Sequence, residues 1–369
     1  MLKKVEITNI NSIKKAEFDF TKGRYQYKND MVYNNGVVSP IAFYGSNGSG
    51  KSSFLKAFSH FVLLLTNEPS QIRGFIPHFE SNNERDGEIS LNTLENSSFK
   101  LQFELNSKNY IYSISTSVDG YISNEELFEE GVELFSRSKS KYTYEHEENE
   151  VVSEMFPLLR TLDIEKNDAV IHSCYEYLSN IGFIDAAKKQ YQIKIAKQKS
   201  YKDIIVEKSS EIKEILSKYR EFPLYDVASK TNELGEKEYS FTINYNNGKL
   251  TLPWILISGG MENQSMLLAA ALSLPENGLL IIDELDDALH PLTILDFINA
   301  VRERNIQLIF SSHNTYILQS LRPDQIFFAH WKSGYSQYKR LSEIYPNIRE
   351  INNIEKMYLS NLFDEDIKK

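Results

Sequence analysis

Hydrophobic and polar positions alternate near both ends of the chain, and this two-residue period is typical of β-strands. Between residues 2 and 20 the alternation lies on either side of a short turn, which predicts two strands. The segments FKLQFEL and YIYSIS, between residues 99 and 115, predict a hairpin. Further strands are predicted over 238–244, 250–256, 324–329 and 334–341.

Elsewhere the apolar residues recur at helical spacing, in the segments 51–66, 266–274 and 291–302. Short apolar runs at 40–44, 279–282 and 307–311 predict buried strands. The alternation of buried strands with helices indicates an α/β fold.

The middle of the chain has a different pattern. Between Pro157 and Pro223 there is no proline and one glycine, Gly182, which predicts a helical insertion. If residues 184–219 formed one helix, it would reach roughly 50 Å at ~1.5 Å per residue. The acidic run 125–150 predicts a solvated face. Six lysines cluster in the insertion: Lys188, Lys189, Lys194, Lys197, Lys199 and Lys202. They could form a solvated helix face, a DNA contact or a patch that binds an acidic protein.

Composition narrows the class of protein. The chain has 369 residues, 41% of them hydrophobic and 25% charged, which is ordinary for a globular protein. The single cysteine, Cys174, excludes an intramolecular disulfide and a cysteine-based zinc site and favours a reducing, cytoplasmic location. No apolar run approaches the ~18 residues of a membrane span, and the N-terminus lacks a secretion signal pattern. Because the net charge is −10, DNA binding would need a local basic patch.

A glycine-rich loop lies between the strand predicted at 40–44 and the helix predicted at 51–66. Its sequence matches G-x-x-x-x-G-K-[ST], in which backbone N–H groups and the following helix N-terminus surround phosphate oxygens. Lys51 is expected to reach the β- and γ-phosphates of ATP, and the Ser52 hydroxyl to ligate Mg²⁺. The predicted phosphate-binding residues are Gly45, Ser46, Asn47, Gly48, Ser49, Gly50, Lys51, Ser52 and Ser53.

Two carboxylates, Asp283 and Glu284, directly follow the apolar run Leu279–Ile282. A buried parallel strand delivers its C-terminal residues to the sheet edge at which ligands bind in α/β folds. We therefore expect Asp283 to hold Mg²⁺, directly or through water, and Glu284 to polarise the water that attacks the γ-phosphate.

The order of the motifs resembles that of ABC-type ATPases. Ile257-Ser258-Gly259-Gly260 resembles the LSGGQ signature and lies 25 positions before Asp283. His313 stands 30 positions after Asp283, where that superfamily has its switch histidine. Three further segments resemble the SMC/OLD-like branch, which includes ATPases of PARIS-type, abortive-infection and OLD-type anti-phage systems: the opening ITNINSIKKAEFDF, the DE-x-x-x-x-LHP match at 283–291 and RPDQIFF at 322–328.

This resemblance implies a mechanism. Two protomers would enclose two nucleotides, with Ser258, Gly259 and Gly260 of one chain meeting the γ-phosphate held by Lys51 of the other. Glu284, His313 and Lys51 would be catalytic. Gln71 and Gln102 are the candidates for the glutamine that senses Mg²⁺.

The chain departs from the ABC pattern at three points. Met261 replaces the signature glutamine, and His290 stands in place of the transporter D-loop aspartate. Ser258 lies 207 residues after Lys51, farther than in a compact transporter subunit.

The resemblance predicts an ABC/SMC-like P-loop NTPase head with an antiparallel β subdomain and a helical insertion. Its predicted parts are 1–115 and 235–345 for the head, 116–234 for a mainly helical insertion and 346–369 for a tail.

The 56 residues after His313 are too few for the Toprim nuclease domain of OLD proteins. The leading hypothesis is therefore an ATP- and Mg²⁺-dependent sensor or scaffold in anti-phage defence. It would dimerise and control a separate nuclease or toxin, with a phage protein or DNA as trigger. Two alternatives are a DNA-repair or recombination ATPase that clamps DNA and an assembly scaffold locked by ATP.

Overall fold

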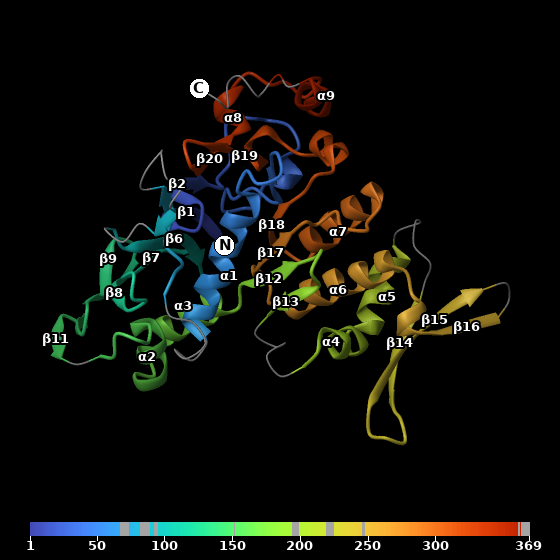
Figure 1. The fold of residues 1–369 in the computed structure, drawn as a ribbon, viewed down its shortest axis with the longest axis horizontal. Helices are drawn as coiled ribbons and strands as arrows, with labels where there is room; N and C mark the ends of the chain where they lie inside the picture. Colours follow the sequence, from blue (N-terminus) through green and yellow to red (C-terminus); the bar gives the residue numbers. More distant parts are fainter. Residues whose placement is uncertain are drawn as a thin grey trace. The chain divides into compact units, whose positions relative to one another are not determined.

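The computed structural model describes residues 1–66, 74–81, 89–91, 95–150, 152–193, 199–218, 225–245, 248–360 and 362. The chain divides into two compact units. Unit 1 comprises Met1–Asn180 with Leu318–Lys369, and unit 2 comprises Ile181–Ile317 (Figure 1). None of the described helices is both long enough and apolar enough to cross a membrane.

Unit 1 contains an eight-stranded antiparallel sheet in the order β11-β10-β9-β8-β7-β6-β1-β2. The strands predicted at 2–20 and the hairpin predicted at 99–115 are confirmed, because alternate side chains such as Phe99, Leu101 and Phe103 are buried. The strands are β1 (Leu2–Ile10), β2 (Ile13–Asp19), β6 (Ser97–Leu105), β7 (Lys108–Thr116), β8 (Ile122–Glu129), β9 (Val132–Ser138), β10 (Lys141–Tyr144) and β11 (Glu147–Glu150). A separate two-stranded sheet pairs β4 (Phe79–Ser81) with β5 (Ile89–Leu91).

A second group of strands in unit 1 carries the glycine loop. β3 pairs in parallel with β19, which pairs antiparallel with β20. An aromatic core joins them, with ring centroids of Phe18 and Phe54 4.1 Å apart and those of Phe43 and Phe327 5.3 Å apart. The elements are β3 (Ile41–Tyr44), α1 (Lys51–Thr66), β19 (Ile326–Lys332) and β20 (Tyr335–Arg340), with α8 (Leu341–Ile344), α9 (Ile354–Leu359) and the 3-10 turns Asn29–Met31 and Pro323–Gln325.

Packing against the antiparallel sheet explains the helical spacing of α1. The rings of Phe58 and Phe61 both lie 5.0 Å from that of Phe99 on β6. The other helices of unit 1 are α2 (Leu158–Glu165) and α3 (Ala169–Ser179), and Cys174 is buried in α3.

The RPD segment at 322–324 anchors the polar stretch that precedes β3. Arg322 and Asp324 are both fully buried, and two 2.8 Å bonds run from the guanidinium to the carboxylate. The guanidinium also donates to the Tyr25 carbonyl at 3.2 Å, and the Asp324 carboxylate accepts from the Gly23 N–H at 2.8 Å. This part of the resemblance to the SMC/OLD-like branch therefore has a structural role.

Unit 2 contains four strands in the order β13-β12-β17-β18, and β12-β17-β18 run parallel. Helices predicted from apolar spacing are present, although α6 starts at Gly259 rather than near Met266. The elements are β12 (Gly182–Asp185), β13 (Gln190–Gln192), α4 (Tyr201–Glu207), α5 (Ser209–Ser217), α6 (Gly259–Ser273), β17 (Leu279–Asp283), α7 (Pro291–Glu303) and β18 (Gln307–Ser311); the 3-10 turn Thr315–Ser320 crosses the unit boundary.

A three-stranded antiparallel sheet in unit 2 leads into α6, and Figure 1 shows it in yellow beside α4 and α5. It orders β14 (Tyr225–Thr231), β15 (Lys237–Tyr245) and β16 (Gly248–Pro253), and a 3-10 turn at Trp254–Leu256 follows. The strands predicted at 238–244 and 250–256 are thus present, with the second one ending at Pro253.

The structure corrects the prediction of a mainly helical segment over 116–234. Residues 122–150 form strands β8 to β11, and Glu125 in the acidic run is fully buried rather than solvated. Residues 182–185 form β12, because all four are buried beside β17, and burial overrides the absence of helix breakers. No single helix therefore spans 184–219. The domain boundaries at 115, 234 and 345 stay a prediction.

Candidate nucleotide site

The glycine loop leaves β3, whose four residues are all buried, and enters α1 at Lys51. Gly45, Gly48 and Gly50 have φ values of +149°, +75° and +105°. A Cβ at Gly50 would lie 1.9 Å from the Ser336 Oγ, and one at Gly45 would lie 2.3 Å from the Ala329 carbonyl oxygen. Only glycine fits these two positions without movement of the backbone or of β20.

Lys51 is buried, with 6% of its surface exposed, and its ammonium group folds back over the loop. The Nζ donates to the carbonyl oxygens of Gly45 at 2.8 Å and Ser46 at 3.1 Å. The Tyr338 hydroxyl donates to the Gly50 carbonyl at 2.7 Å. These bonds stabilise the conformation of the loop. Ser46, Asn47 and Gly48 are exposed at its tip.

The loop residues fit a phosphate group. The Ser49 Oγ is buried and has no hydrogen-bond partner among the described residues. A Cβ at Gly48 would meet nothing within 4 Å, so space is open above that backbone. A buried hydroxyl without a partner is a group that a phosphate oxygen would satisfy. Ser52 and Ser53 follow in the first turn of α1, both partly exposed.

In unit 2, the acid pair is held by the neighbouring strand β18. The Ser311 Oγ donates to the Asp283 carboxylate at 2.6 Å, and the Glu284 N–H donates to the same Oγ at 2.8 Å. Glu284 has φ +57°, a left-handed conformation that is uncommon for glutamate. Asp283 is buried, whereas Glu284 is partly exposed. One serine side chain therefore bonds both the Asp283 carboxylate and the Glu284 backbone.

The signature segment forms the N-terminal end of α6. Ser258 is the N-cap, and its side chain accepts from the Met261 N–H at 3.2 Å. Gly260 approaches the loop that follows the acid pair so closely that a Cβ there would lie 2.8 Å from the Ala288 carbonyl oxygen. The Asn263 amide donates to the Asp287 carbonyl at 3.0 Å. Ser258 and Gly259 remain exposed.

His313 and His290 both lie at exposed positions in unit 2. The backbone N–H of His313 donates to the Asp286 carboxylate at 3.1 Å, which ties the segment after β18 to the loop after the acid pair. His290 is the N-cap of α7, and its Nδ1 accepts from the Leu292 N–H at 3.3 Å. The LHP segment thus starts a helix, with Pro291 at the first helical position.

Sequence reasoning missed a polar cluster around Glu262, in the first turn of α6. Its carboxylate accepts from the Tyr201 hydroxyl and the Trp254 Nε1, both at 2.8 Å, and pairs with Lys189. Burial raises the pKa of Glu262, but the hydrogen bonds from Lys189, Trp254 and Tyr201 outweigh it and lower the pKa below its usual value. In the sequence, the position of Glu262 two residues after Gly260 was the one feature that could have indicated this cluster.

The lysine cluster does not lie on one helix. Lys188 and Lys189 lie in the turn between β12 and β13, Lys199 precedes α4, and Lys202 lies in α4. Three of these four pair with carboxylates, at 3.2 Å for Lys188 with Asp185 and 2.6 Å for Lys199 with Glu207. Lys194 and Lys197 lie outside the described residues.

The predicted site residues are divided between the two units, with 45–53 in unit 1 and 258–260, 283–284 and 313 in unit 2. Gln71 lies outside the described residues, and Gln102 lies within β6 rather than in a loop.

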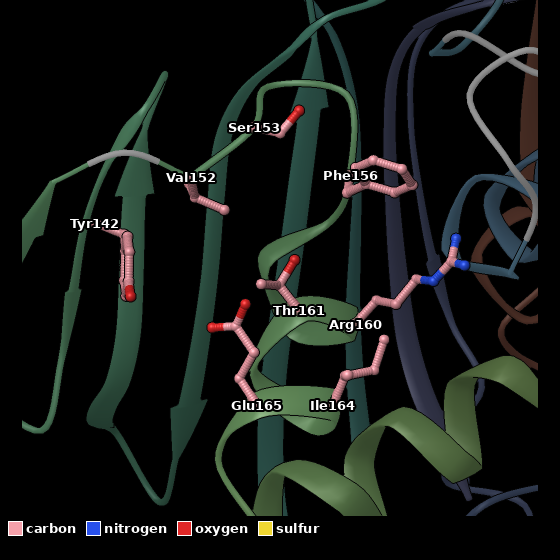
Figure 2. A pocket seen from close by; sticks show the side chains of 8 residues that line it. All are labelled: Tyr142, Val152, Ser153, Phe156, Arg160, Thr161, Ile164 and Glu165. Atoms are coloured by element: carbon pink, nitrogen blue, oxygen red, sulfur yellow. The ribbon is translucent and has the colours of Figure 1, made fainter.

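Unit 1 also contains a hollow of about 420 Å³ lined by residues of α2, the segment before it and Tyr142 (Figure 2). None of the predicted nucleotide residues lines this hollow.

Comparisons with known proteins identify the family of the chain. A family model described as "AAA domain, putative AbiEii toxin, Type IV TA system" matches residues 41–319, about three quarters of the chain. A search of curated protein sequences gave no match.

Among solved structures, the SmcHead bound to the C-winged helix domain of ScpA is similar, with a TM-score of 0.50 and 15% identity over 92% of this chain and 97% of that chain. The SMC head domain from Thermotoga maritima has a TM-score of 0.49 and 15% identity over 92% and 98%. An Smc head with an extended coiled coil, bound to the C-terminal domain of ScpA derived from Pyrococcus furiosus, has a TM-score of 0.44 and 14% identity over 92% and 95%.

The SmcHead likeness agrees with the predicted α/β class, which is confirmed. The chain belongs to the family "AAA domain, putative AbiEii toxin, Type IV TA system", and its fold is similar to that of an SMC head domain.

Proposed function

We propose that the chain binds and hydrolyses Mg²⁺·ATP and uses the cycle to regulate a separate effector in bacterial anti-phage defence, in the cytoplasm. The glycine loop is the observation that carries the nucleotide part. A Cβ at Gly45 or Gly50 would clash with neighbouring atoms, and the buried Lys51 bonds to the loop carbonyls. The buried Ser49 hydroxyl has no partner among the described residues. A loop built in this way serves to surround an anion.

The proposed roles follow from the chemistry of each side chain. Lys51 moves from the loop carbonyls to the β- and γ-phosphate oxygens, and Ser52 and Asp283 hold the metal ion. Bound Mg²⁺ neutralises charge on the phosphate oxygens. Glu284 accepts a hydrogen bond from the attacking water, which His313 helps to orient. Ser258 and the backbone of Gly259 and Gly260 contact the γ-phosphate held by a second copy of the chain.

The defence role is supported by the name of the matching family, which refers to a toxin and a type IV TA system. An effector on another polypeptide, a nuclease or a toxin, would then respond to ATP-driven association of two or more copies. A phage protein or DNA would be the trigger. The clamping of DNA by the lysine cluster has less support, because three of the four described lysines pair with carboxylates of their own chain.

Replacing Lys51 with alanine should weaken ATP binding about tenfold or more, because a charged hydrogen bond contributes about 1.5–3 kcal/mol. Titration with a fluorescent ATP analogue in Mg²⁺ measures the change. Lys56→Ala, on the same helix α1, removes an equal charge and is the matched control. Equal affinity of Lys51→Ala and wild type would contradict the proposed phosphate contact.

The defence role is tested by phage plating. Cells that carry the native locus with its flanking genes should restrict some phages, and cells in which this chain carries Glu284→Gln should restrict them differently. If neither strain affects any phage in a broad panel, the defence role fails. ATP hydrolysis stimulated by duplex DNA and steeply reduced by salt would then support the DNA clamp.

A further inference from the structure

Unit 2 has a hollow of about 820 Å³ between α4 and the three-stranded sheet. Three lysines and one glutamate line it: Lys202, Lys230, Lys237 and Glu238. The hollow therefore carries a positive charge on a chain whose net charge is −10. Such a local reversal of sign favours an anionic partner.

The three lysines differ in how their charge is compensated. Lys237 pairs with Asp203 at 2.7 Å, and Lys230 pairs with Glu238 at 3.1 Å. Lys202 has no carboxylate partner among the described residues. Its ammonium group lies 4.9 Å from the centre of the Trp254 ring and 5.6 Å from that of Tyr239. The Lys202 charge is thus held in place by aromatic faces and is available to an incoming carboxylate.

Exposed aliphatic side chains border this charge. Ile255, which lines the hollow, is 88% exposed, and the adjacent Leu256 is 64% exposed. Both follow Trp254 in the 3-10 turn, which is fixed by the bond from the Trp254 Nε1 to Glu262. Two bulky apolar residues on a fixed turn beside a basic hollow match the mixed character of a protein interface.

The Trp254 ring in the hollow is already contacted by other side chains of its own chain. The Trp254 ring makes edge contacts with Tyr239 at 5.8 Å and Phe241 at 5.0 Å, and Lys202 lies over it. Base stacking needs an open aromatic face, whereas a peptide needs a cation and an apolar surface. The observations therefore favour a protein segment over a nucleic acid strand.

We propose that this basic hollow docks a protein segment that carries acidic residues and one bulky apolar side chain. A carboxylate of the segment pairs with Lys202, and the apolar side chain packs on Ile255. The proposal rests on the proposed function in assigning that segment to the effector or the trigger protein. Because Trp254 bonds to Glu262 in the first turn of α6, the bound segment contacts the turn that supports the signature residue Ser258.

The experiment uses the full chain and a yeast-displayed library of random dodecapeptides. Peptides enriched on the wild-type chain should be acidic and should contain a large apolar residue. The best one, synthesised with a fluorescein label, is then titrated by anisotropy. Lys202→Glu should weaken its affinity at least tenfold, and Ile255→Asp should do so as well. Lys249→Glu makes the same change of charge at an exposed site of β16 outside the hollow and should bind the peptide as wild type does.

Three results would overturn the docking proposal. One is enrichment of peptides without acidic character, and another is equal affinity of the Lys202→Glu and Lys249→Glu variants. The third is binding of a labelled single-stranded or duplex oligonucleotide that Lys202→Glu abolishes, which would make nucleic acid the ligand. Glu284→Gln separates this proposal from the proposed function, since that variant should keep peptide binding whether or not the chain hydrolyses ATP.

Discussion

Glu284→Gln should lower the rate of ATP hydrolysis at least a hundredfold while ATP still binds, because a positioned general base contributes about 10²–10⁴-fold. Glutamine is nearly isosteric with glutamate, so the backbone bond to Ser311 and the φ of +57° should persist. The loss would then reflect the missing carboxylate. Release of inorganic phosphate measures the rate.

The same variant should accumulate as an ATP-bound dimer, which light scattering with and without ATP detects. Glu214→Gln, an identical change at an exposed position on α5, is the matched control and should hydrolyse ATP at the wild-type rate. A Glu284→Gln protein that stays monomeric with ATP would contradict a site shared between two copies. One that hydrolyses ATP normally would remove Glu284 from the mechanism.

Arg322→Met should lower the free energy of unfolding of unit 1 by about 3–5 kcal/mol, the usual cost of breaking a buried ion pair by removing one partner. The variant leaves the Asp324 carboxylate buried without its two 2.8 Å bonds. It also frees the segment around Tyr25 from its anchor. Urea unfolding followed by tyrosine and tryptophan fluorescence measures the change.

A double variant tests whether the uncompensated charge is the cause. Arg322→Met combined with Asp324→Asn removes both charges and keeps an acceptor for the Gly23 N–H. It should recover part of the lost stability. If the double variant is as unstable as Arg322→Met alone, the loss arises from packing rather than from the buried charge.

The glycine loop, the acid pair and the strands and helices around them could be predicted from the sequence, because each combines a strict pattern with local structure. Gly50 has a φ of +105°, which favours glycine in any fold, and the buried run Leu279–Ile282 must be apolar in any fold. Both features can therefore be recognised in the sequence. Ser258 at a helix N-cap is equally local. The partners of these residues could not be predicted, since Ser311 reaches Asp283 only after two strands pair.

The strands over 122–150 were missed because their buried positions include charged residues. Glu125 is fully buried, where it accepts from the Tyr112 hydroxyl and the Leu159 N–H, both at 2.8 Å. The Arg137 guanidinium lies 3.7 Å from the same carboxylate. A single sequence cannot distinguish such a buried acid from the exposed acids beside it, because the distinction arises from tertiary contacts.

The helical expectation for 184–219 failed for a related reason. β12 has four residues, and pairing with β17 decides its conformation. The lysines that follow then lie in a turn and at a helix start, where Glu262, Asp185 and Glu207 meet them.

The burial of Cys174 has a practical consequence for spectroscopy. Burial raises the pKa of its thiol to about 12, with the nearby carboxylates of Glu129 and Asp168 adding to the shift. The thiol is therefore protonated at neutral pH and shielded from maleimide reagents. Because it is the only cysteine in the chain, a cysteine introduced at an exposed position such as Glu214 would take up a dye selectively. Mixed donor- and acceptor-labelled copies would then report association in real time by energy transfer, with the native cysteine left in place.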